Sequence, residues 1–274
     1  MKRILFLTKK VHAKRLRRLG FFLRMLLKKT KVSYKNVYKE TDLTLDKGTL
    51  YITDDLDTFN KIKSLGSEAI VLIDDEKMME SFKDATFFLM DAEATEHVYY
   101  ERLNKRINDE PWEMIKTKRL LLRETIESDV DDFVKIYENP EMTKYTEALY
   151  EDPEEERKYV AEYREKVYKI QGFGIWTVIR KKDNKIIGRA GLTAREGFDN
   201  YEIGFAIGCD YQRKGYGYEA VKAILSFAKR NELGEINALV MPGNEASKRL
   251  LSKAGFLKVS DTMLGKEHYE VWHR

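Results

Sequence analysis

The first 110 residues alternate short apolar runs with segments of helical periodicity. Apolar and β-branched runs predict strands at RILFLT (3–8), TLYITD (49–54), EAIVLID (68–74) and ATFFLMD (85–91). Between them, apolar spacings of three and four residues predict helices near 12–30, 55–65, 76–83 and 93–108. Continuous apolar strands joined by helices are typical of parallel sheets. Residues 1–112 are therefore predicted to form a small α/β domain with a parallel sheet.

The pattern changes after Pro111, because proline disfavours helix in the residue before it. Strands then predominate, and we expect them at 119–124, 174–180, 185–194, 201–208, 236–241 and 268–273. The second and third of these form a predicted hairpin. Helices are expected from Ser128 or Asp129 to about Tyr137, at 153–169, at 218–231, and from Asn244 to a glycine cap at Gly255. We therefore expect a second domain over residues 117–274.

Composition narrows the class of protein. A chain of 274 residues with 43% hydrophobic content exceeds one typical core, which agrees with two domains. The single cysteine, Cys209, excludes an internal disulfide, and no Cys/His cluster predicts a metal site. The longest apolar runs fall short of the roughly 18 residues of a membrane span, and the charged start MKRILFLTKK does not fit a secretory signal. We expect a cytoplasmic protein with no transmembrane segment and no metal.

Charge is distributed unevenly along the chain. Fourteen of the 50 basic residues and no acidic residue lie in 1–39, so residues 40–274 carry 36 basic and 46 acidic residues. A segment of this kind could follow a phosphate backbone, which predicts RNA or ribosome contact through residues 1–39. The apolar stripe of the 12–30 helix could instead lie on an anionic membrane surface, or pack on the small sheet. No RNA-binding motif supports the first alternative.

One strand-to-helix junction carries the candidate chemistry. Strand 201–208 is followed by a loop that contains Gln212, Arg213, Lys214, Gly215, Tyr216 and Gly217. Glycines let successive backbone amides approach an anion, and the helix that follows adds its positive dipole end. Arg213 and Lys214 add positive charge, so the loop suits a pyrophosphate. Neither GxxxxGK[ST] nor GxGxxG is present, which argues against a P-loop and a dinucleotide fingerprint.

The order of the motifs resembles the GCN5-related N-acetyltransferase (GNAT) family, particularly its branch that acetylates ribosomal-protein N-termini. The resemblance covers about 117–274 and rests on TKRLLLRETIESDVDDF, YEIGFAIG, QRKGYG and NEASKRLLSKAGF in family order. It implies a mixed, mostly antiparallel sheet with a splayed central strand, flanked by helices. It also implies an acyl-CoA-dependent N-acyltransferase that uses acetyl-CoA as co-substrate and a small-molecule or peptide amine as acceptor.

The same resemblance assigns roles to individual residues. The amides of 212–217 are expected to bind the CoA pyrophosphate, and the strand end near Ile207 to pair with the pantetheine arm. Asn244 is expected to contact that arm, although it could simply cap the last helix. Glu202 is the candidate catalytic base, because an amine must lose a proton before it attacks the thioester. A structural ion pair is the alternative role for Glu202.

Leu251 departs from the family pattern, in which a tyrosine often serves as general acid at this position. A hydrocarbon cannot protonate a leaving thiolate, so either another group does this or the thiolate leaves unassisted, since thiol pKa values lie at about 8.5. Tyr216 and Tyr218 are nearby in sequence, but nothing in the sequence shows that they reach the sulfur. The acidic run 151–156 could attract a cationic amine, or could be a solvated helix start.

A hypothesis of a different class competes with the enzyme. Residues 1–112 could be an RNA- or partner-binding module whose GNAT domain serves as an acyl-CoA sensor. Such a protein would bind RNA in a salt-dependent manner that is lost with residues 1–39. The intact loop at 212–217 and the carboxylate of Glu202 favour the enzyme.

Overall fold

The protein is represented by a computed structural model, which describes residues 3–8, 31–36, 45–46, 48–90, 92, 95 and 97–274. It divides into two compact units, Met1–Glu110 and Pro111–Arg274. The predicted helix 12–30 lies outside the described residues, as does most of the basic segment 1–39. None of the helices in the described ranges is long and apolar enough to cross a membrane.

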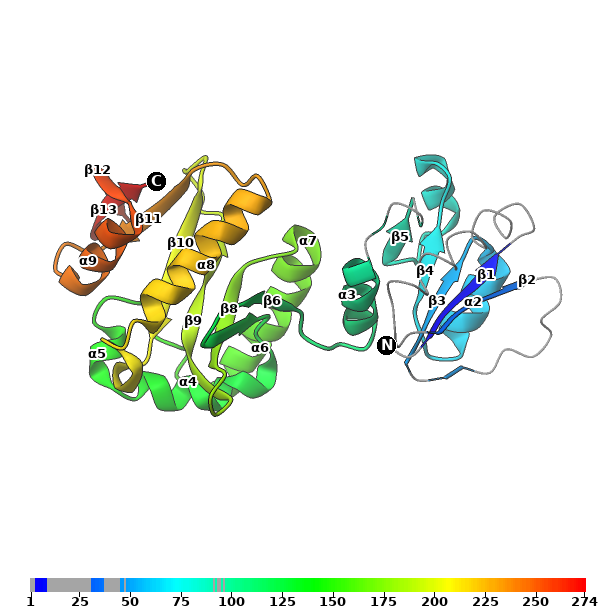
Figure 1. The fold of residues 1–274 in the computed structure, drawn as a ribbon, viewed down its shortest axis with the longest axis horizontal. Helices are drawn as coiled ribbons and strands as arrows, with labels where there is room; N and C mark the ends of the chain where they lie inside the picture. The colour runs from blue at the N-terminus through cyan, green and yellow to red at the C-terminus, as the bar shows by residue number, and fades with distance from the viewer. Residues whose placement is uncertain are drawn as a thin grey trace. The chain divides into compact units, whose positions relative to one another are not determined.

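The first unit contains a five-stranded parallel sheet in the order β2-β1-β3-β4-β5 (Figure 1). Its strands are β1 (Arg3–Thr8), β2 (Lys31–Asn36), β3 (Thr49–Thr53), β4 (Ala69–Leu72) and β5 (Phe87–Leu89). The helices among its described residues are α2 (Leu56–Ser64), the 3₁₀ turn η2 (Glu76–Ser81) and α3 (His97–Ile107). The predicted parallel sheet is confirmed. The apolar pattern does not predict β2, whose sequence KVSYKN is mostly polar.

Both faces of this sheet are covered, which explains why β1, β3 and β4 are mostly apolar. Phe6 and Ile52 pack on one face in a cluster that includes Tyr100 of α3. Tyr51 packs on the other face in a cluster that includes Phe59 of α2. Alternate residues of β1, β3 and β4 therefore belong to different clusters, as the two-residue period of a strand requires.

The second unit is built on an eight-stranded sheet in the order β12-β13-β11-β10-β9-β8-β7-β6 (Figure 1). Its strands are β6 (Glu113–Lys116), β7 (Leu120–Arg123), β8 (Ile175–Arg180), β9 (Lys185–Thr193), β10 (Tyr201–Ile207), β11 (Ile236–Val240), β12 (Leu257–Leu264) and β13 (Glu267–His273). Its longer helices are α4 (Val130–Tyr137), α6 (Pro153–Tyr163), α8 (Tyr216–Arg230) and α9 (Glu245–Ala254). The predicted hairpin is β8 and β9, which pair antiparallel.

The centre of the sheet opens between two strands. Neighbouring strands pair antiparallel except β10 and β11, which run parallel. Within residues 111–274, all of which are described, β10 and β11 pair only at Tyr201 with Ile236 and at Glu202 with Asn237. Beyond Glu202 the two strands separate. The predicted mixed, mostly antiparallel sheet with a splayed central strand is confirmed.

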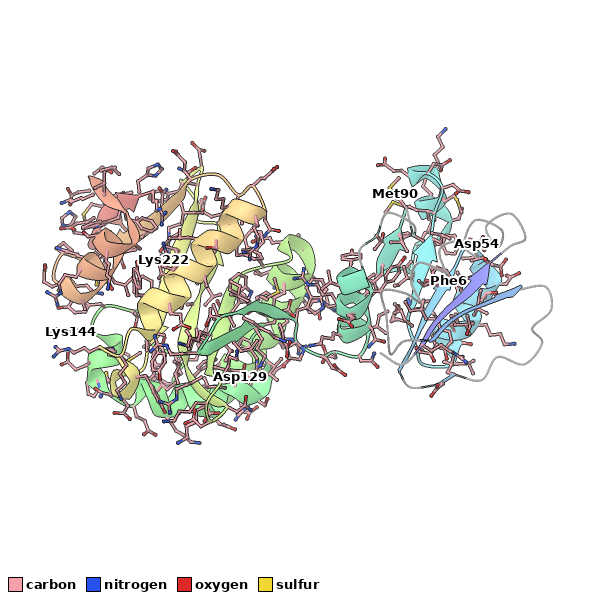
Figure 2. The ribbon with its side chains drawn as sticks, viewed as in Figure 1. Phe6, Asp54, Met90, Asp129, Lys144 and Lys222 are labelled. Carbon is pink, nitrogen blue, oxygen red and sulfur yellow. The ribbon has the colours of Figure 1, made fainter. Side chains whose placement is uncertain are left out.

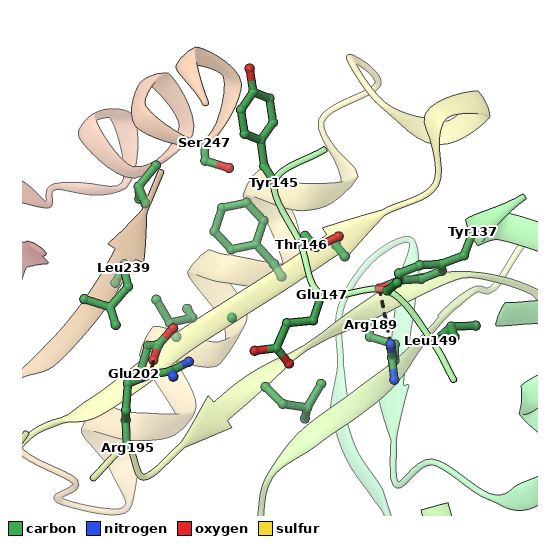
Figure 3. A pocket seen from close by; sticks show the side chains of 18 of the residues that line it. Tyr137, Tyr145, Thr146, Glu147, Leu149, Arg189, Arg195, Glu202, Leu239 and Ser247 are labelled. Carbon is green, nitrogen blue, oxygen red and sulfur yellow. Dashed lines mark hydrogen bonds and ion pairs between the residues drawn. The ribbon is translucent and has the colours of Figure 1, made fainter. Parts of the chain in front are cut away.

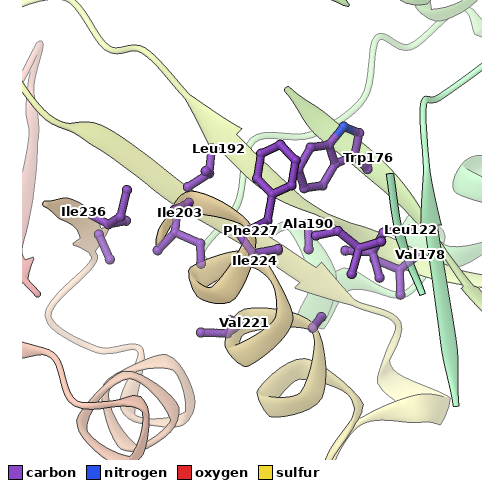
Figure 4. Close-up of a cluster of buried hydrophobic side chains, with 14 of the residues drawn as sticks. Leu122, Trp176, Val178, Ala190, Leu192, Ile203, Val221, Ile224, Phe227 and Ile236 are labelled. Carbon is purple, nitrogen blue, oxygen red and sulfur yellow. The ribbon is translucent and has the colours of Figure 1, made fainter. Parts of the chain in front are cut away.

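Helix α8 packs on this sheet and forms the centre of the hydrophobic core (Figure 4). Val221, Ile224 and Phe227 lie on its buried face, at the helical spacing of three residues. Phe227 meets the buried Trp176 edge to face, with ring centroids 5.2 Å apart. Since α8 starts at the loop that follows β10, this packing also fixes where that loop lies.

The helix predicted at 153–169 is interrupted. Residues Pro153–Tyr163 are α-helical, Arg164–Tyr168 form a π-helical turn, and α7 (Lys169–Gln171) ends the segment. In a π-turn the i to i+5 bonding brings residues five apart towards one side of the helix. Here the phenols of Tyr163 and Tyr168 both reach the backbone of Ile175, the first through its N–H at 2.9 Å and the second through its carbonyl. Apolar spacing alone cannot predict this interruption.

Stability of the second unit is predicted to depend on Ile224, which is fully buried. Replacing Ile224 with alanine should lower the free energy of unfolding by about 3 kcal/mol, because it leaves a cavity under α8. Tryptophan fluorescence during chemical denaturation reports on this unit alone, because the three tryptophans of the chain are Trp112, Trp176 and Trp272.

The matched control is Lys222→Ala, on the exposed face of the same helix (Figure 2). It should change the free energy of unfolding by less than about 0.5 kcal/mol. Equal effects of the two substitutions would contradict the packing described for α8.

Candidate active site

The loop between β10 and α8 presents several backbone amides to solvent. Residues 212–215 are exposed, and the first hydrogen bond of α8 runs from Glu219 N–H to Gly215 O at 3.1 Å. In this fully described part of the chain, no acceptor is recorded for the amides of 213–218. A helix begins with such unsatisfied amides, and together with the helix dipole they favour an anion. The predicted loop thus has the geometry of an anion site.

Two glycines allow the loop to take this path. Gly215 has φ +80°, a left-handed conformation that glycine adopts without strain. A Cβ on Gly217 would lie 3.0 Å from Leu250 Cδ1 and 3.7 Å from Ile207 Cγ1. The start of α8 therefore lies against both α9 and the end of β10. Arg213 also has a positive φ, of 57°, which is uncommon for a residue with a side chain.

A cluster from the β6–β7 turn holds the loop in place. The Glu219 carboxylate accepts hydrogen bonds from Thr117 Oγ1 at 2.6 Å, from the Arg119 amide at 2.9 Å and from Arg119 Nε at 2.6 Å. Arg119 also donates to the carbonyl of Lys214 at 2.9 Å, and its guanidinium lies 4.5 Å from the ring centroid of Tyr216. Sequence reasoning missed this cluster, because its members lie about a hundred residues apart.

Side chains of the loop also bind its own backbone. Gln212 Nε2 donates to the carbonyl of Ile207 at 2.9 Å, which ties the predicted loop residue to the predicted strand end. Lys214 Nζ donates to the carbonyl of Asp210 at 2.6 Å. Both contacts fold the loop back onto the end of β10, so the candidate residues Ile207, Gln212 and Gly217 lie close together.

A cavity of about 590 Å³ lies along the opening between β10 and β11 (Figure 3). Residues 202–206 of β10 and 238–240 of β11 line it, and the start of α9 contributes Asn244 and Ser247. The remaining wall comes from α4, the connection between α5 (Pro140–Thr143) and α6, α6, β8, β9, the β9–β10 loop and β13. It includes Tyr137, Tyr145, Glu147, Tyr150, Glu156, Tyr159, Tyr163, Ile175, Arg189, Arg195 and Tyr269. The cavity is thus polar and aromatic on one side and bordered by the splayed strands on the other.

Glu202 lies in this cavity and is mostly buried, with 9% exposure. Its carboxylate accepts a hydrogen bond from Arg195 Nε in a close ion pair. Burial raises the pKa of Glu202 above its usual 4.5, and the charge of Glu147 adds to the rise, while Arg195 opposes it. The two alternatives for Glu202 are therefore compatible, since it forms an ion pair and also lines the cavity.

Arg195 was not predicted, although the strand register offers a signal. Glu202 lies opposite Thr193 at the end of β9. The residues just after Thr193 therefore lie near Glu202, and Arg195 is the basic residue among them.

A second ion pair lies deeper in the same wall. Arg189 Nη1 lies 3.3 Å from Glu156, and Arg189 Nη2 lies 3.3 Å from the hydroxyl of Tyr137. Glu156 belongs to the acidic run 151–156, and it corrects the reading of that run as a wholly solvated helix start. Asp152 does cap α6 and Glu154 is exposed, but Glu156 is 3% exposed. Helical spacing turns Glu156 inward, one turn after the cap.

The remaining candidates have clear places. Asn244 caps α9 by accepting a hydrogen bond from Ser247 N–H at 3.1 Å, and it also lines the cavity. Leu251 is fully buried and lines the cavity as well. The ammonium nitrogen of Lys253 lies 4.6 Å from the ring centroid of Tyr218. Neither Tyr216 nor Tyr218 is among the residues that line the cavity. The described residues contain no group of His, Cys, Asp or Glu arranged to hold a metal.

Comparison with known proteins identifies the second unit. Residues 119–257 match the model of the Acetyltransferase (GNAT) domain family. The uncharacterized N-acetyltransferase YoaA of Bacillus subtilis is 30% identical over 152 residues, which cover 53% of this chain and 83% of the relative. The chain belongs to the GNAT family of N-acetyltransferases. The predicted family resemblance and the predicted enzyme class are confirmed.

Other relatives agree with this assignment of the GNAT domain. The uncharacterized N-acetyltransferase YnaD of Bacillus subtilis is 32% identical over 145 residues, which cover 52% of this chain and 81% of the relative. The ribosomal-protein-S5-alanine acetyltransferase of Vibrio fischeri has a similar structure, with a TM-score of 0.51 and 20% identity over 60% of this chain and 95% of its own. At that identity the likeness concerns the fold. GNAT enzymes use acetyl-CoA as the acetyl donor.

The cluster at the loop predicts a stability change in acid. Burial opposes ionisation of Glu219, but the hydrogen bonds from Thr117 and Arg119 outweigh it and hold the pKa of Glu219 below its usual 4.5. A lowered pKa in the folded state stabilises the fold above about pH 4.5, and this contribution disappears as the pH falls through the folded value. Wild type should therefore lose more stability between pH 5 and pH 3 than Glu219→Gln, as measured by tryptophan fluorescence during denaturation. Parallel losses in the two proteins would contradict the role given to Glu219.

Proposed function

We propose that residues 117–274 form a catalytic domain that transfers an acetyl group from acetyl-CoA to a primary amine, on a protein N-terminus or on a small molecule. Residues 1–112 would form a separate α/β domain, and the division of the chain between Glu110 and Pro111 supports these boundaries. One observation carries the proposal. A loop of unsatisfied amides adjoins the splayed strand, and the splay leads into a cavity that holds a buried carboxylate.

The loop is proposed to bind the diphosphate of acetyl-CoA. The amides of Arg213 to Tyr218 would donate to its oxygens, and the exposed Arg213 would add positive charge. The pantetheine arm would run along the edge of β10 that is not paired with β11, past Ile207 and towards Asn244. An unpaired strand edge offers backbone donors and acceptors of the kind that the amides of the arm need.

Glu202 is proposed as the base. The acceptor nitrogen would lose a proton to Glu202, directly or through a water molecule, and then attack the thioester carbon. The carbon–sulfur bond would break, CoA would leave as a thiolate, and the acetylated nitrogen would give its surplus proton to that thiolate or to water, which leaves a neutral amide. Leu251 has no proton to give, and the low pKa of a thiol, about 8.5, makes an unassisted departure chemically reasonable. A raised pKa makes Glu202 a stronger base than an ordinary glutamate.

Replacing Glu202 with glutamine tests this role. We expect kcat to fall roughly 10²–10⁴-fold, because the amide cannot accept the proton, while acetyl-CoA affinity stays within about twofold. Thiol release from acetyl-CoA measures turnover with an alanyl peptide, spermidine and hexylamine as acceptors, and isothermal titration measures affinity.

Of the acidic run 151–156, only Glu156 lines the cavity. The control is therefore Glu151→Gln, which removes the same charge from an exposed position outside the cavity. It should leave both quantities unchanged. Unchanged turnover in Glu202→Gln would remove Glu202 from the mechanism. Failure of the wild type to bind acetyl-CoA at millimolar concentration would sink the proposed function itself.

A further inference from the structure

The cavity wall includes one carboxylate that binds no other residue. Glu147 lies in the connection between α5 (Pro140–Thr143) and α6, and its side chain points into the cavity over the central strands (Figure 3). Glu202 is paired with Arg195, and Glu156 with Arg189. In the fully described range 97–274, no ion pair or hydrogen bond is recorded for the side chain of Glu147. It is therefore available to a ligand.

The charges around the cavity do not balance without a ligand. Three carboxylates line it, Glu147, Glu156 and Glu202, against two guanidinium groups, Arg189 and Arg195. Each of the two ion pairs is neutral in itself, so the negative charge of Glu147 is left without a compensating positive charge. A site with one uncompensated carboxylate attracts a cation and repels an anion. The phenol rings of the same wall offer further favourable contacts for a cation.

Several groups of the cavity respond to the charge of Glu147. Burial is the main cause of the raised pKa values of Glu202 and Tyr269, and the negative charge of Glu147 adds to both. The pKa of Tyr159 is also raised; burial is the largest cause, and the charge of Glu147 is one of the smaller ones. These groups belong to β10, β13 and α6, so the charge of Glu147, whose side chain is exposed, acts on three elements of the cavity wall.

We propose that Glu147 binds the ammonium form of the acceptor amine and that the acceptors are cationic amines without a neighbouring negative charge. This inference deepens the proposed function and rests on it. An amine at neutral pH arrives protonated, and Glu147 holds that charge as the nitrogen enters the cavity. The N–H bond then breaks, the proton passes to Glu202, and the neutral amine attacks. The two carboxylates thus have different roles: Glu147 binds the cation, and Glu202 accepts the proton.

The test uses a pair of ligands that differ in charge. Hexylamine is protonated at pH 7, and 1-hexanol has nearly the same shape but no charge. Each is titrated by ligand-observed NMR into the full chain saturated with CoA, which contains no acetyl group and so allows binding without transfer. The wild type should bind hexylamine about tenfold more tightly than 1-hexanol.

Three variants make the test specific. Glu147→Gln should reduce the preference for hexylamine to about twofold and leave the 1-hexanol affinity unchanged. Glu147→Asp, which keeps the charge, should retain most of the preference. Glu151→Gln, the exposed control, should behave like the wild type. Thermal melting followed by tryptophan fluorescence checks that each variant is folded.

The outcomes separate this inference from the function on which it rests. An unchanged preference in Glu147→Gln, an equal loss in Glu151→Gln, or no preference in the wild type would each overturn the role of Glu147. The ligand affinities of the wild type and of each variant are measured only after the CoA affinity of the same protein has been determined. Absence of CoA binding would instead overturn the proposed function.

Discussion

The structure of the second unit depends on how little of β10 pairs with β11. Two residue pairs, Tyr201 with Ile236 and Glu202 with Asn237, hold the strands together before they separate. Three features follow from this limited pairing. One edge of β10 stays free beyond Glu202, a cavity forms along the opening, and the start of α8 lies against both α9 and the end of β10. Continued pairing to the end of β10 would close the opening and leave no room for a thioester between the strands.

Electrostatics in the opening reflects a balance between burial and pairing. A buried carboxylate without a partner is costly, and breaking a buried ion pair typically destabilises a protein by about 3–5 kcal/mol. Arg195 reduces that cost at Glu202, and Arg189 does so at Glu156. Burial still raises the pKa of Glu202, so its partner does not fully compensate for the lost water. Glu147 is exposed, which is why it can remain unpaired at little cost.

Local sequence patterns predicted much of the fold. The apolar strands β1, β3 and β4 and the amphipathic helix α8 were predictable because burial dictates their residues directly. Strand β2 was not predicted, because its sequence is mostly polar. The π-turn at Arg164–Tyr168 was missed as well, since two phenols that bind one distant residue leave no periodic signal.

The candidate active site likewise contains one part that the sequence predicts and one part that it does not. The loop 212–217, Glu202 and Asn244 lie in one continuous part of the chain, where motif and geometry can be read together. The opposite wall comes from Tyr137 to Tyr163, and its partners were not predictable. Arg119 meets Glu219 across about a hundred residues, and Glu147 has no motif around it. Contacts of this kind become visible only when the sheet brings distant segments together.

The central claim is that the amides from Arg213 to Tyr218 bind the diphosphate of acetyl-CoA. Hydrogen exchange of individual amides, measured by NMR with and without acetyl-CoA, tests it most directly. These six amides have no acceptor in the loop, so they should exchange rapidly in the free protein and slow markedly when acetyl-CoA binds. Binding that leaves their exchange unchanged, and that protects amides elsewhere in the chain, would contradict the account.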